Sequence, residues 1–234
     1  MLSIIIPVLN EGGFINQVLE NLVSQSFKKF EVILVDGNST DNSLKIIKSY
    51  LKKLDLRILN SKTRNVSYQR NLGAKNAKNE RILFLDADCS FDNQFIEDSL
   101  QEISARKIEV SGARLYPDSN NLIDIIFYGG FRIFMVIFHS FIGLNGGCIF
   151  TLKELHNKIH GFDEEIKVGE DYDYTCRLKK YTKLKMLHTK IKTSTRRFHK
   201  NGRLRTGLKV VFMGFYILIF GKIKNNLFNY RFNE

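Results

Sequence analysis

The chain has 234 residues, of which 44% are hydrophobic and only two are proline, so it can bury a sizeable core and is not a disordered chain. Its three cysteines are widely spaced and form no Cys-x-x-Cys pair, which argues against a zinc site or a disulfide framework and predicts a reducing compartment. The net charge of +12 is uneven: residues 172–234 hold sixteen Lys and Arg but two Asp and Glu, whereas residues 1–171 are nearly neutral. This basic tail predicts an anionic partner.

The first half of the chain alternates short apolar runs with helical patterns. Apolar runs at 3–7, 30–35, 56–59 and 81–85 have the length and composition of buried strands. Helical patterns separate them, and this alternation predicts a parallel, doubly wound sheet. Beyond it, we expect a helix near 94–106 and a strand near 109–115. The first apolar run begins without a preceding basic segment, so no signal peptide is expected.

Two later segments are strongly apolar. Segment 122–144 is rich in Phe and Ile but contains Asp124, Arg132 and His139, so we expect a buried or interfacial helix and not a bilayer span. Segment 210–221 would reach only about 18 Å as a helix, short of a bilayer core of about 30 Å, and predicts either an interfacial helix or one packed on the body. We therefore predict a main domain over residues 1–205 and a basic, partly apolar segment over 206–234.

The most informative motif is Asp86-Ala87-Asp88, at the end of the fourth apolar run. Side chains two apart in a strand point to the same face, so we expect both carboxylates on one side, at the edge where open α/β sheets bind ligands. Two such oxygen donors suit Mg²⁺ or Mn²⁺ held against a diphosphate. The alternative is structural, because Asp-x-Asp also caps strands and turns.

Acidic residues also follow the first two runs and open a later helical pattern. Glu11 and Asp36 fall on the same predicted edge, where an acidic side chain can accept from a base or a ribose hydroxyl. Asp36 and Asp41 are equally explained by a turn and a helix cap. The Glu170-Asp171 pair either caps a helix or supplies a base beside an acceptor.

Taken in series, these motifs resemble the family 2 glycosyltransferases of GT-A fold, in order and spacing from residue 1 to about 200. The segments that carry the resemblance are 3–11, 35–43, 70–74, 85–88, 146–147, 161–164, 169–171 and 193–198. The resemblance implies an α/β fold, with a Rossmann-like, mostly parallel central sheet flanked by helices and a C-terminal helical, basic segment.

It also implies inverting transfer of a sugar from a nucleoside diphosphate sugar to an acceptor hydroxyl or a lipid-linked acceptor. Asp88, supported by Asp86, would hold Mg²⁺ or Mn²⁺, and Asp171, with Glu170 beside it, would be the general base. Gly37 stands where many members carry a second aspartate, so recognition of the base would rest on Asp36 or another group. A UDP-sugar stays the favoured donor. The residues implied to bind the nucleotide sugar are Pro7, Leu9, Glu11, Asp36, Asn38, Arg64, Arg70, Asp86, Ala87, Asp88, Gly146, Gly147, Arg196 and Arg197.

Three other classes of protein fit the sequence less well. A sugar nucleotidyltransferase needs a basic Gly-rich loop after the first strand, whereas Asn10-Glu11-Gly12-Gly13 is acidic. A nucleic-acid-binding protein would interleave basic and exposed aromatic residues, whereas the tail pairs charge with a continuous apolar run, which fits an anionic membrane surface better. A non-catalytic binding protein on a GT-A-like fold would have no need of all four carboxylates. We expect a cytoplasmic enzyme, peripheral at the inner face of the cell membrane, with no nucleic-acid partner.

Overall fold

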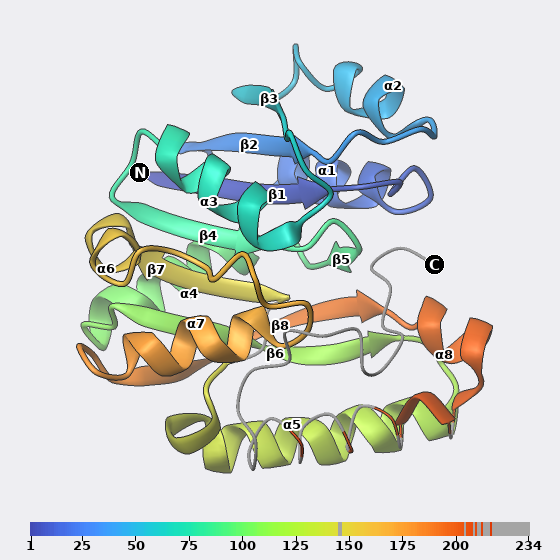
Figure 1. Cartoon of the computed structure of the whole chain (residues 1–234), viewed down its shortest axis with the longest axis vertical. Helices are drawn as coiled ribbons and strands as arrows, with labels where there is room; N and C mark the ends of the chain where they lie inside the picture. Colours follow the sequence, from blue (N-terminus) through green and yellow to red (C-terminus); the bar gives the residue numbers. More distant parts are fainter. Residues whose placement is uncertain (145–146, 204, 208, 210–211, 213–215, 217–234) are drawn as a thin grey trace.

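A computed structural model describes residues 1–144, 147–203, 205–207, 209, 212 and 216. Within these residues, the core is an eight-stranded sheet in the order β3-β2-β1-β4-β7-β6-β8-β5, with helices on both faces (Figure 1). The strands are β1 (Leu2–Val8), β2 (Phe30–Asp36), β3 (Leu56–Asn60), β4 (Arg81–Leu85), β5 (Cys89–Ser90), β6 (Val110–Asp118), β7 (Cys148–Leu152) and β8 (Leu184–Ser194).

The sheet combines a parallel half with a mixed half. β3, β2, β1 and β4 are mutually parallel, as the alternation of strands and helices predicted. β7 then runs antiparallel to both β4 and β6, while β6 and β8 are parallel to each other. As a result β1, β2, β4, β6 and β8 all end at the same edge of the sheet, and β7 begins there.

The parallel half forms because its strands are almost purely apolar. Every residue of β1 and β2 is buried, which is typical of central strands covered on both faces. The helices α1 (Ile15–Ser24), α2 (Ser43–Lys48) and α3 (Val66–Asn76) connect the strands of this half, as the helical patterns between the apolar runs predicted. The α4 helix (Phe95–Ala105) follows β5, close to its predicted position near 94–106.

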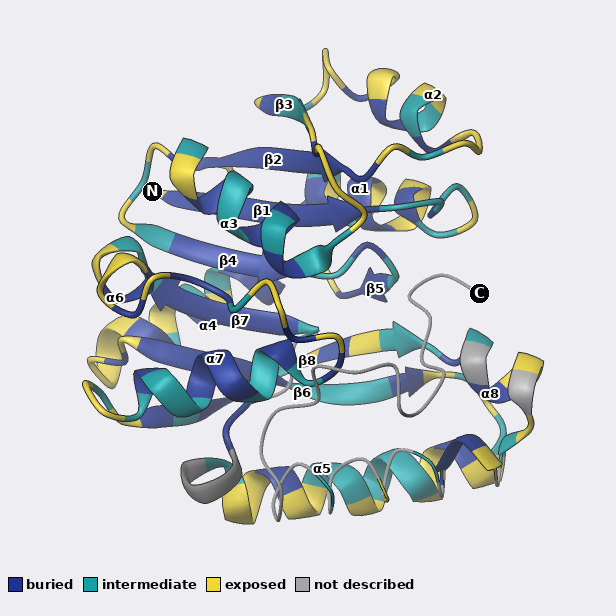
Figure 2. Cartoon of the chain, viewed as in Figure 1, coloured by how far each residue is buried: buried dark blue, intermediate teal, exposed yellow. Residues whose placement is uncertain are grey.

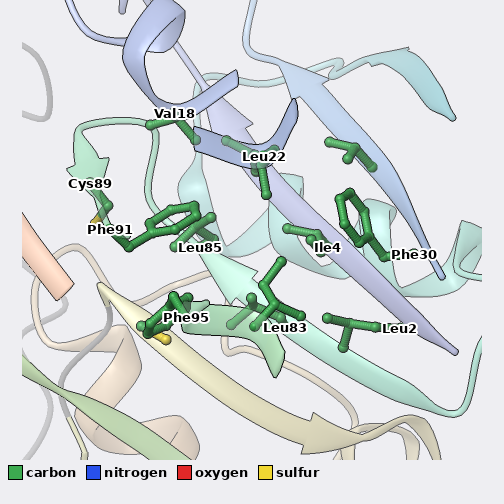
Figure 3. Packing of buried hydrophobic residues seen from close by; sticks show 14 of the residues in the cluster. Leu2, Ile4, Val18, Leu22, Phe30, Leu83, Leu85, Cys89, Phe91 and Phe95 are labelled. Carbon is green, nitrogen blue, oxygen red and sulfur yellow. The ribbon is translucent and has the colours of Figure 1, made fainter. Parts of the chain in front are cut away.

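Two apolar layers enclose the sheet. On one face α1 and α4 bury Leu22, Phe95 and their neighbours against Ile4, Leu83 and Leu85 (Figure 3). On the other face lie α3, α6 (Lys153–Lys158), α7 (Glu170–Leu178) and part of α5 (Leu122–Ile142). The second cluster includes an aromatic group in which the rings of Phe162 and Tyr174 stack at 3.9 Å.

The helix α5 lies along the outer side of β6 and β8 (Figure 1) and packs by one narrow stripe. Asp124 and Met135 are buried, whereas Ile126 is 65% exposed and Ile137 59% exposed (Figure 2). By length and composition alone the helix could cross a membrane, with a mean hydropathy of 1.7 over Leu122–His139 and 11% of that window buried.

The end of the chain is described only in part. The α8 helix (Arg196–Asn201) follows β8, and Arg203 Nε donates to Asp124 Oδ1 of α5 at 3.0 Å. The predicted apolar helix at 210–221 lies outside the described residues, apart from positions 212 and 216. The predicted boundary at residue 205 therefore stays a prediction.

Gly73 allows α3 to pack directly on β1. A Cβ atom there would lie 2.4 Å from Ile5 Cγ2, a stiff β-branched side chain that is fully buried. We expect Gly73→Ala to lower the free energy of unfolding by about 1–3 kcal/mol, although alanine is the better helix former by about 1 kcal/mol. Denaturant titration of the variant measures the change.

Gly13→Ala is the matched control, because a Cβ there meets nothing within 4 Å and the backbone is not in the left-handed region. Its effect should stay within about 0.5 kcal/mol. Equal stability of the two variants would contradict the close packing of α3 on β1.

Candidate functional site

The loops that follow β1, β2, β4 and β8 meet at one edge of the sheet, where open α/β folds bind ligands. The two antiparallel strands do not break this arrangement. Because β7 pairs antiparallel with β4, Gly147 at its start lies beside Asp86, whose N–H donates to the Gly147 carbonyl at 3.2 Å. Likewise the Ser194 N–H, at the end of β8, donates to the Asp88 carbonyl at 3.1 Å.

Arg70 of α3 joins two parts of this edge. It is 2% exposed, and its guanidinium donates to Glu170 Oε1 at 2.9 Å and to Asp86 Oδ1 at 2.8 Å. It also lies over the ring of Phe162, at 5.1 Å. Burial alone would lower the pKa of Arg70, but Asp86 and Glu170 more than offset this effect and the pKa is raised. The structure therefore places Arg70 as a clamp between two carboxylates, and its implied contact with the nucleotide sugar stays a prediction.

Arg196 makes a second clamp. Its guanidinium binds Glu11 through two hydrogen bonds of 2.6 and 2.7 Å and lies 3.8 Å from Asp88. The ring of Phe14 lies below it at 4.8 Å. Unlike Arg70, it keeps 25% of its side chain exposed. Glu11, Arg196 and Asp88 thus continue the row that Asp86, Arg70 and Glu170 begin.

The Asp86-Ala87-Asp88 motif is a turn, and not the end of a strand as predicted. β4 ends at Leu85, so strand alternation does not set the directions of the two carboxylates. The arginines do: Arg70 binds Asp86, and Arg196 lies beside Asp88. Ala87 between them is buried in the core, which anchors the turn. The two carboxylates come to the same edge through tertiary contacts.

This row of residues fits a divalent cation. Of the described residues, no three His, Cys, Asp or Glu gather as a ready-made metal cluster. However, Asp86 and Asp88 keep 35% and 20% of their side chains exposed, and the row holds more carboxylates than arginines. A hard cation such as Mg²⁺ takes few protein oxygens and completes its shell with water and phosphate oxygens. Asp88, with Asp86, could hold such an ion.

Asp171, in the first turn of α7, has an unusual proton affinity. Burial, together with the charge of adjacent Glu170, raises its pKa to about 7 against the opposing charge of Arg70. A carboxylate that titrates near neutral pH is suited to accept a proton from a hydroxyl. Glu170 is instead fixed by Arg70, so the two adjacent carboxylates differ in their availability.

The loop that leads to α7 is tied to α3. Asn71 Oδ1 accepts from the Phe162 N–H at 2.8 Å, and Asn71 Nδ2 donates to the Phe162 carbonyl at 2.9 Å. Gly161 before it has a φ of +68°, and a Cβ there would lie 2.5 Å from Asn71 Oδ1. The Arg70-Asn71 pair thus holds the carboxylate of Asp86 and the segment before Asp171 at once.

The loops after β1 and β2 are joined by hydrogen bonds from residues that the sequence did not single out as functional. The Asn10 N–H donates to Ser39 Oγ at 3.0 Å, and the Gly12 N–H donates to Asp41 Oδ2 at 2.8 Å. Gln69 Nε2 donates to the carbonyls of Val8 and Val35, at 2.9 and 2.7 Å, and so fixes the ends of both strands. Only the turn-forming composition of 36–43 pointed to these contacts.

The remaining residues predicted to bind the nucleotide sugar differ in burial and in hydrogen-bond partners. Asp36 is buried and accepts from the N–H groups of Asn38 and Ser39. These contacts are those of a turn, the other role that the sequence allowed for Asp36. Arg64 is exposed and donates to the Asn38 carbonyl at 3.2 Å, which brings these two predicted residues together. Pro7 is buried in β1, and Leu9 follows that strand. Gly146 and the side chain of Arg197 lie outside the described residues.

The effect of Glu170 on the pKa of Asp171 can be tested by substitution. Glu170→Gln removes the negative charge that disfavours ionisation of Asp171, so we expect the pKa of Asp171 to fall below about 7. Titration of ¹³C-labelled aspartate by NMR, with Asp171→Asn used to assign the signal, measures the shift. Glu20→Gln, on the exposed face of α1, is the control and should leave the signal in place. An unchanged or raised pKa in Glu170→Gln would contradict the coupling.

Comparison with known proteins supports the family and the fold. The sequence profile of Glycosyl transferase family 2 matches residues 3–159. The poly(ribitol-phosphate) beta-N-acetylglucosaminyltransferase TarS of Staphylococcus aureus is 33% identical over 112 residues, which are 46% of this chain and 20% of TarS. The chain thus spans a minor part of this curated relative.

Solved structures show the same architecture over nearly the whole chain. TarS 1–349 in complex with UDP-GlcNAc matches with a TM-score of 0.69 and 20% identity, over 92% of this chain and 66% of that one. The mannosyltransferase PcManGT of Pyrobaculum calidifontis, in complex with GDP-Man and Mn²⁺, matches with a TM-score of 0.73 and 18% identity, over 93% of this chain and 64% of that one. Both confirm the predicted GT-A fold. With two thirds of its length matched by the family profile, the chain belongs to glycosyltransferase family 2.

Proposed function

We infer that the protein transfers a sugar from a nucleoside diphosphate sugar to an acceptor hydroxyl, with inversion at the anomeric carbon. The observation that supports this most is the row of carboxylates clamped by Arg70 and Arg196 at the carboxyl edge of the sheet. It includes residues suited to a metal–diphosphate, and Asp171, the residue after Glu170, has a carboxylate with a pKa of about 7. A non-catalytic binding protein would need neither feature.

On the donor side, Asp88 and Asp86 would hold Mg²⁺ or Mn²⁺ against the diphosphate. When bound, the ion offsets the charge that grows on the leaving phosphate. Arg196 lies beside Asp88 and is partly exposed, so its guanidinium would meet the same phosphates. Glu11, after β1, and Asp36, at the end of β2, would line the nucleoside pocket, with Asn38 and Arg64 at its rim.

On the acceptor side, Asp171 is the proposed general base. It takes the proton from the acceptor hydroxyl as the oxygen attacks the anomeric carbon from the face opposite the diphosphate. Glu170, held by Arg70, acts on this step by raising the pKa of Asp171. Gly147, whose carbonyl accepts from the Asp86 N–H, would let the donor sugar and the acceptor approach the backbone.

A UDP-sugar is the favoured donor, since the relative TarS was solved with UDP-GlcNAc, although PcManGT was solved with GDP-Man. The acceptor is a saccharide or a lipid-linked molecule of the cell envelope, by analogy with the poly(ribitol-phosphate) named for TarS. We propose that the enzyme works in the cytoplasm, at the inner membrane face, to which the basic segment from residue 172 is attracted.

Two substitutions separate the roles of metal ligand and base. Asp171→Asn should lower sugar transfer by about 10²–10⁴-fold and leave nucleotide binding intact, because it removes only the proton acceptor. Asp88→Ala should weaken both transfer and metal-dependent nucleotide binding. The measurement is nucleotide release across a panel of sugar nucleotides, with and without Mn²⁺, together with calorimetric binding of UDP and GDP.

Asp173→Asn is a comparison from the same helix, because Asp173 is paired with Arg177 at 2.7 Å and has no proposed part in the chemistry. It should retain most of the transfer activity. Full activity of Asp171→Asn would overturn the assigned base. An absence of nucleotide binding at any metal concentration would overturn the proposed function itself.

A further inference from the structure

A groove of about 220 Å³ lies between α5 and the sheet, away from the carboxylate row. Arg114 of β6 and Arg132 of α5 line it together with the apolar side chains of Ile133, Val136 and Ile137. Small-molecule pockets usually measure roughly 300–1,000 Å³, so this groove is large enough for a head group but not for a whole ligand. Its combination of two arginines and an apolar wall is the feature to be explained.

The cations in and beside the groove have no anionic partner within the described part of the chain. Arg132 lies over the ring of Tyr116 at 4.2 Å, and Lys190 of β8 approaches the same ring at 5.7 Å. The Arg114 Nε–H is buried and donates to no acceptor among the described residues. None of these three cations is among the ion pairs of the described residues, whereas Arg70, Arg177 and Arg196 all are. Converging, unneutralised guanidinium groups are suited to a phosphate.

The apolar wall of the groove continues onto an open surface. Beyond Ile133 and Ile137, the outward face of α5 exposes Ile126 by 65% and Phe134 by 43% (Figure 2). A free phosphate ion would gain nothing from this surface. An amphiphile would, because its head group would meet the arginines while its chain, and the membrane around it, covered the helix.

The groove and the proposed base lie on the same face of the sheet. Met135 and Leu144 of the α5 region share one apolar cluster with Ala74 of α3 and Tyr174 of α7. The Leu144 N–H donates to Thr175 Oγ1 at 3.0 Å, and Thr175 Oγ1 donates to the Asp171 carbonyl at 2.8 Å. Gly143, which follows the last residue of α5, is seven positions after Val136, a rise of about 10 Å along the helix. A molecule anchored in the groove is therefore within reach of Asp171.

We propose that this groove binds the phosphate of a lipid-phosphate-linked acceptor, with the lipid chain along the exposed face of α5. The proposal rests on the proposed function, which it deepens by naming the acceptor class. The gap of about two helical turns between the groove and α7 indicates that the reacting hydroxyl belongs to a group carried beyond the phosphate, and not to the phosphate itself.

The test is vesicle binding by the full chain. The probes are vesicles of phosphatidylcholine alone, vesicles that also contain about 10 mol% phosphatidate (a phosphomonoester), and vesicles that also contain about 10 mol% phosphatidylglycerol (a phosphodiester). All three are tested at roughly physiological salt. Arg114→Gln/Arg132→Gln should raise the phosphatidate concentration at half-binding by about 30-fold, because two cationic contacts are lost. Ile133→Asn/Ile137→Asn should also weaken binding, because the apolar contact is lost.

Lys45→Gln/Lys48→Gln is the matched control, with the same charge change on the exposed side of α2. It should bind phosphatidate vesicles as the wild type does. Equal losses in this control and in the arginine variant would reduce the effect to general attraction and overturn the proposal. Binding of phosphatidate without binding of phosphatidylglycerol would also overturn it, because a phosphate that carries the acceptor group is a phosphodiester. Displacement by inorganic phosphate with no effect of the isoleucine changes would point to a free-phosphate site and also overturn it.

Calorimetric binding of UDP and GDP to the wild type, measured in parallel, keeps the two proposals apart. Nucleotide binding without phosphatidate binding would overturn only the acceptor groove. Phosphatidate binding without nucleotide binding would leave the groove in place and remove the transfer reaction.

Discussion

The site depends on a buried charge. Arg70 is 2% exposed, and a guanidinium without its hydration is stable only where carboxylates meet it with good geometry. Asp86 and Glu170 supply them, and they come from the end of β4 and the start of α7. The folded chain must therefore bring these two segments to α3, so the need to neutralise this buried charge also fixes the edge where the proposed chemistry occurs.

The second clamp follows the same scheme with a different consequence. Arg196 has two carboxylate neighbours, Glu11 and Asp88, but a quarter of its side chain is exposed. An exposed guanidinium can exchange a carboxylate for a phosphate at little cost in solvation, whereas Arg70 cannot leave its partners. The edge thus has a fixed half beside Asp171 and an adjustable half beside Asp88. This division matches an acceptor base that must stay in place and a donor that must enter and leave.

The outer surface of α5 extends this arrangement to the acceptor. The helix is attached to α7 through Leu144 and Thr175, yet most of its length presents isoleucine and phenylalanine to solvent. An apolar face of this extent is unfavourable in water and favourable at a membrane surface. With unneutralised arginines at its margin, the same helix that supports the base side would also position a lipid-phosphate head near it.

The sequence by itself determined the parallel half of the sheet, because buried parallel strands are near-continuous apolar runs that local composition reveals. It also placed Glu11, Asp36, Asp86 and Asp88 at one edge, since parallel strands all end on the same side. It did not reveal the antiparallel β7 or the strand β8, whose pairing depends on distant partners. Nor could it assign Arg70, because Glu170 is 100 residues away in the chain. Which charges become neutralised partners and which stay available is decided by burial, and burial exists only in the tertiary structure.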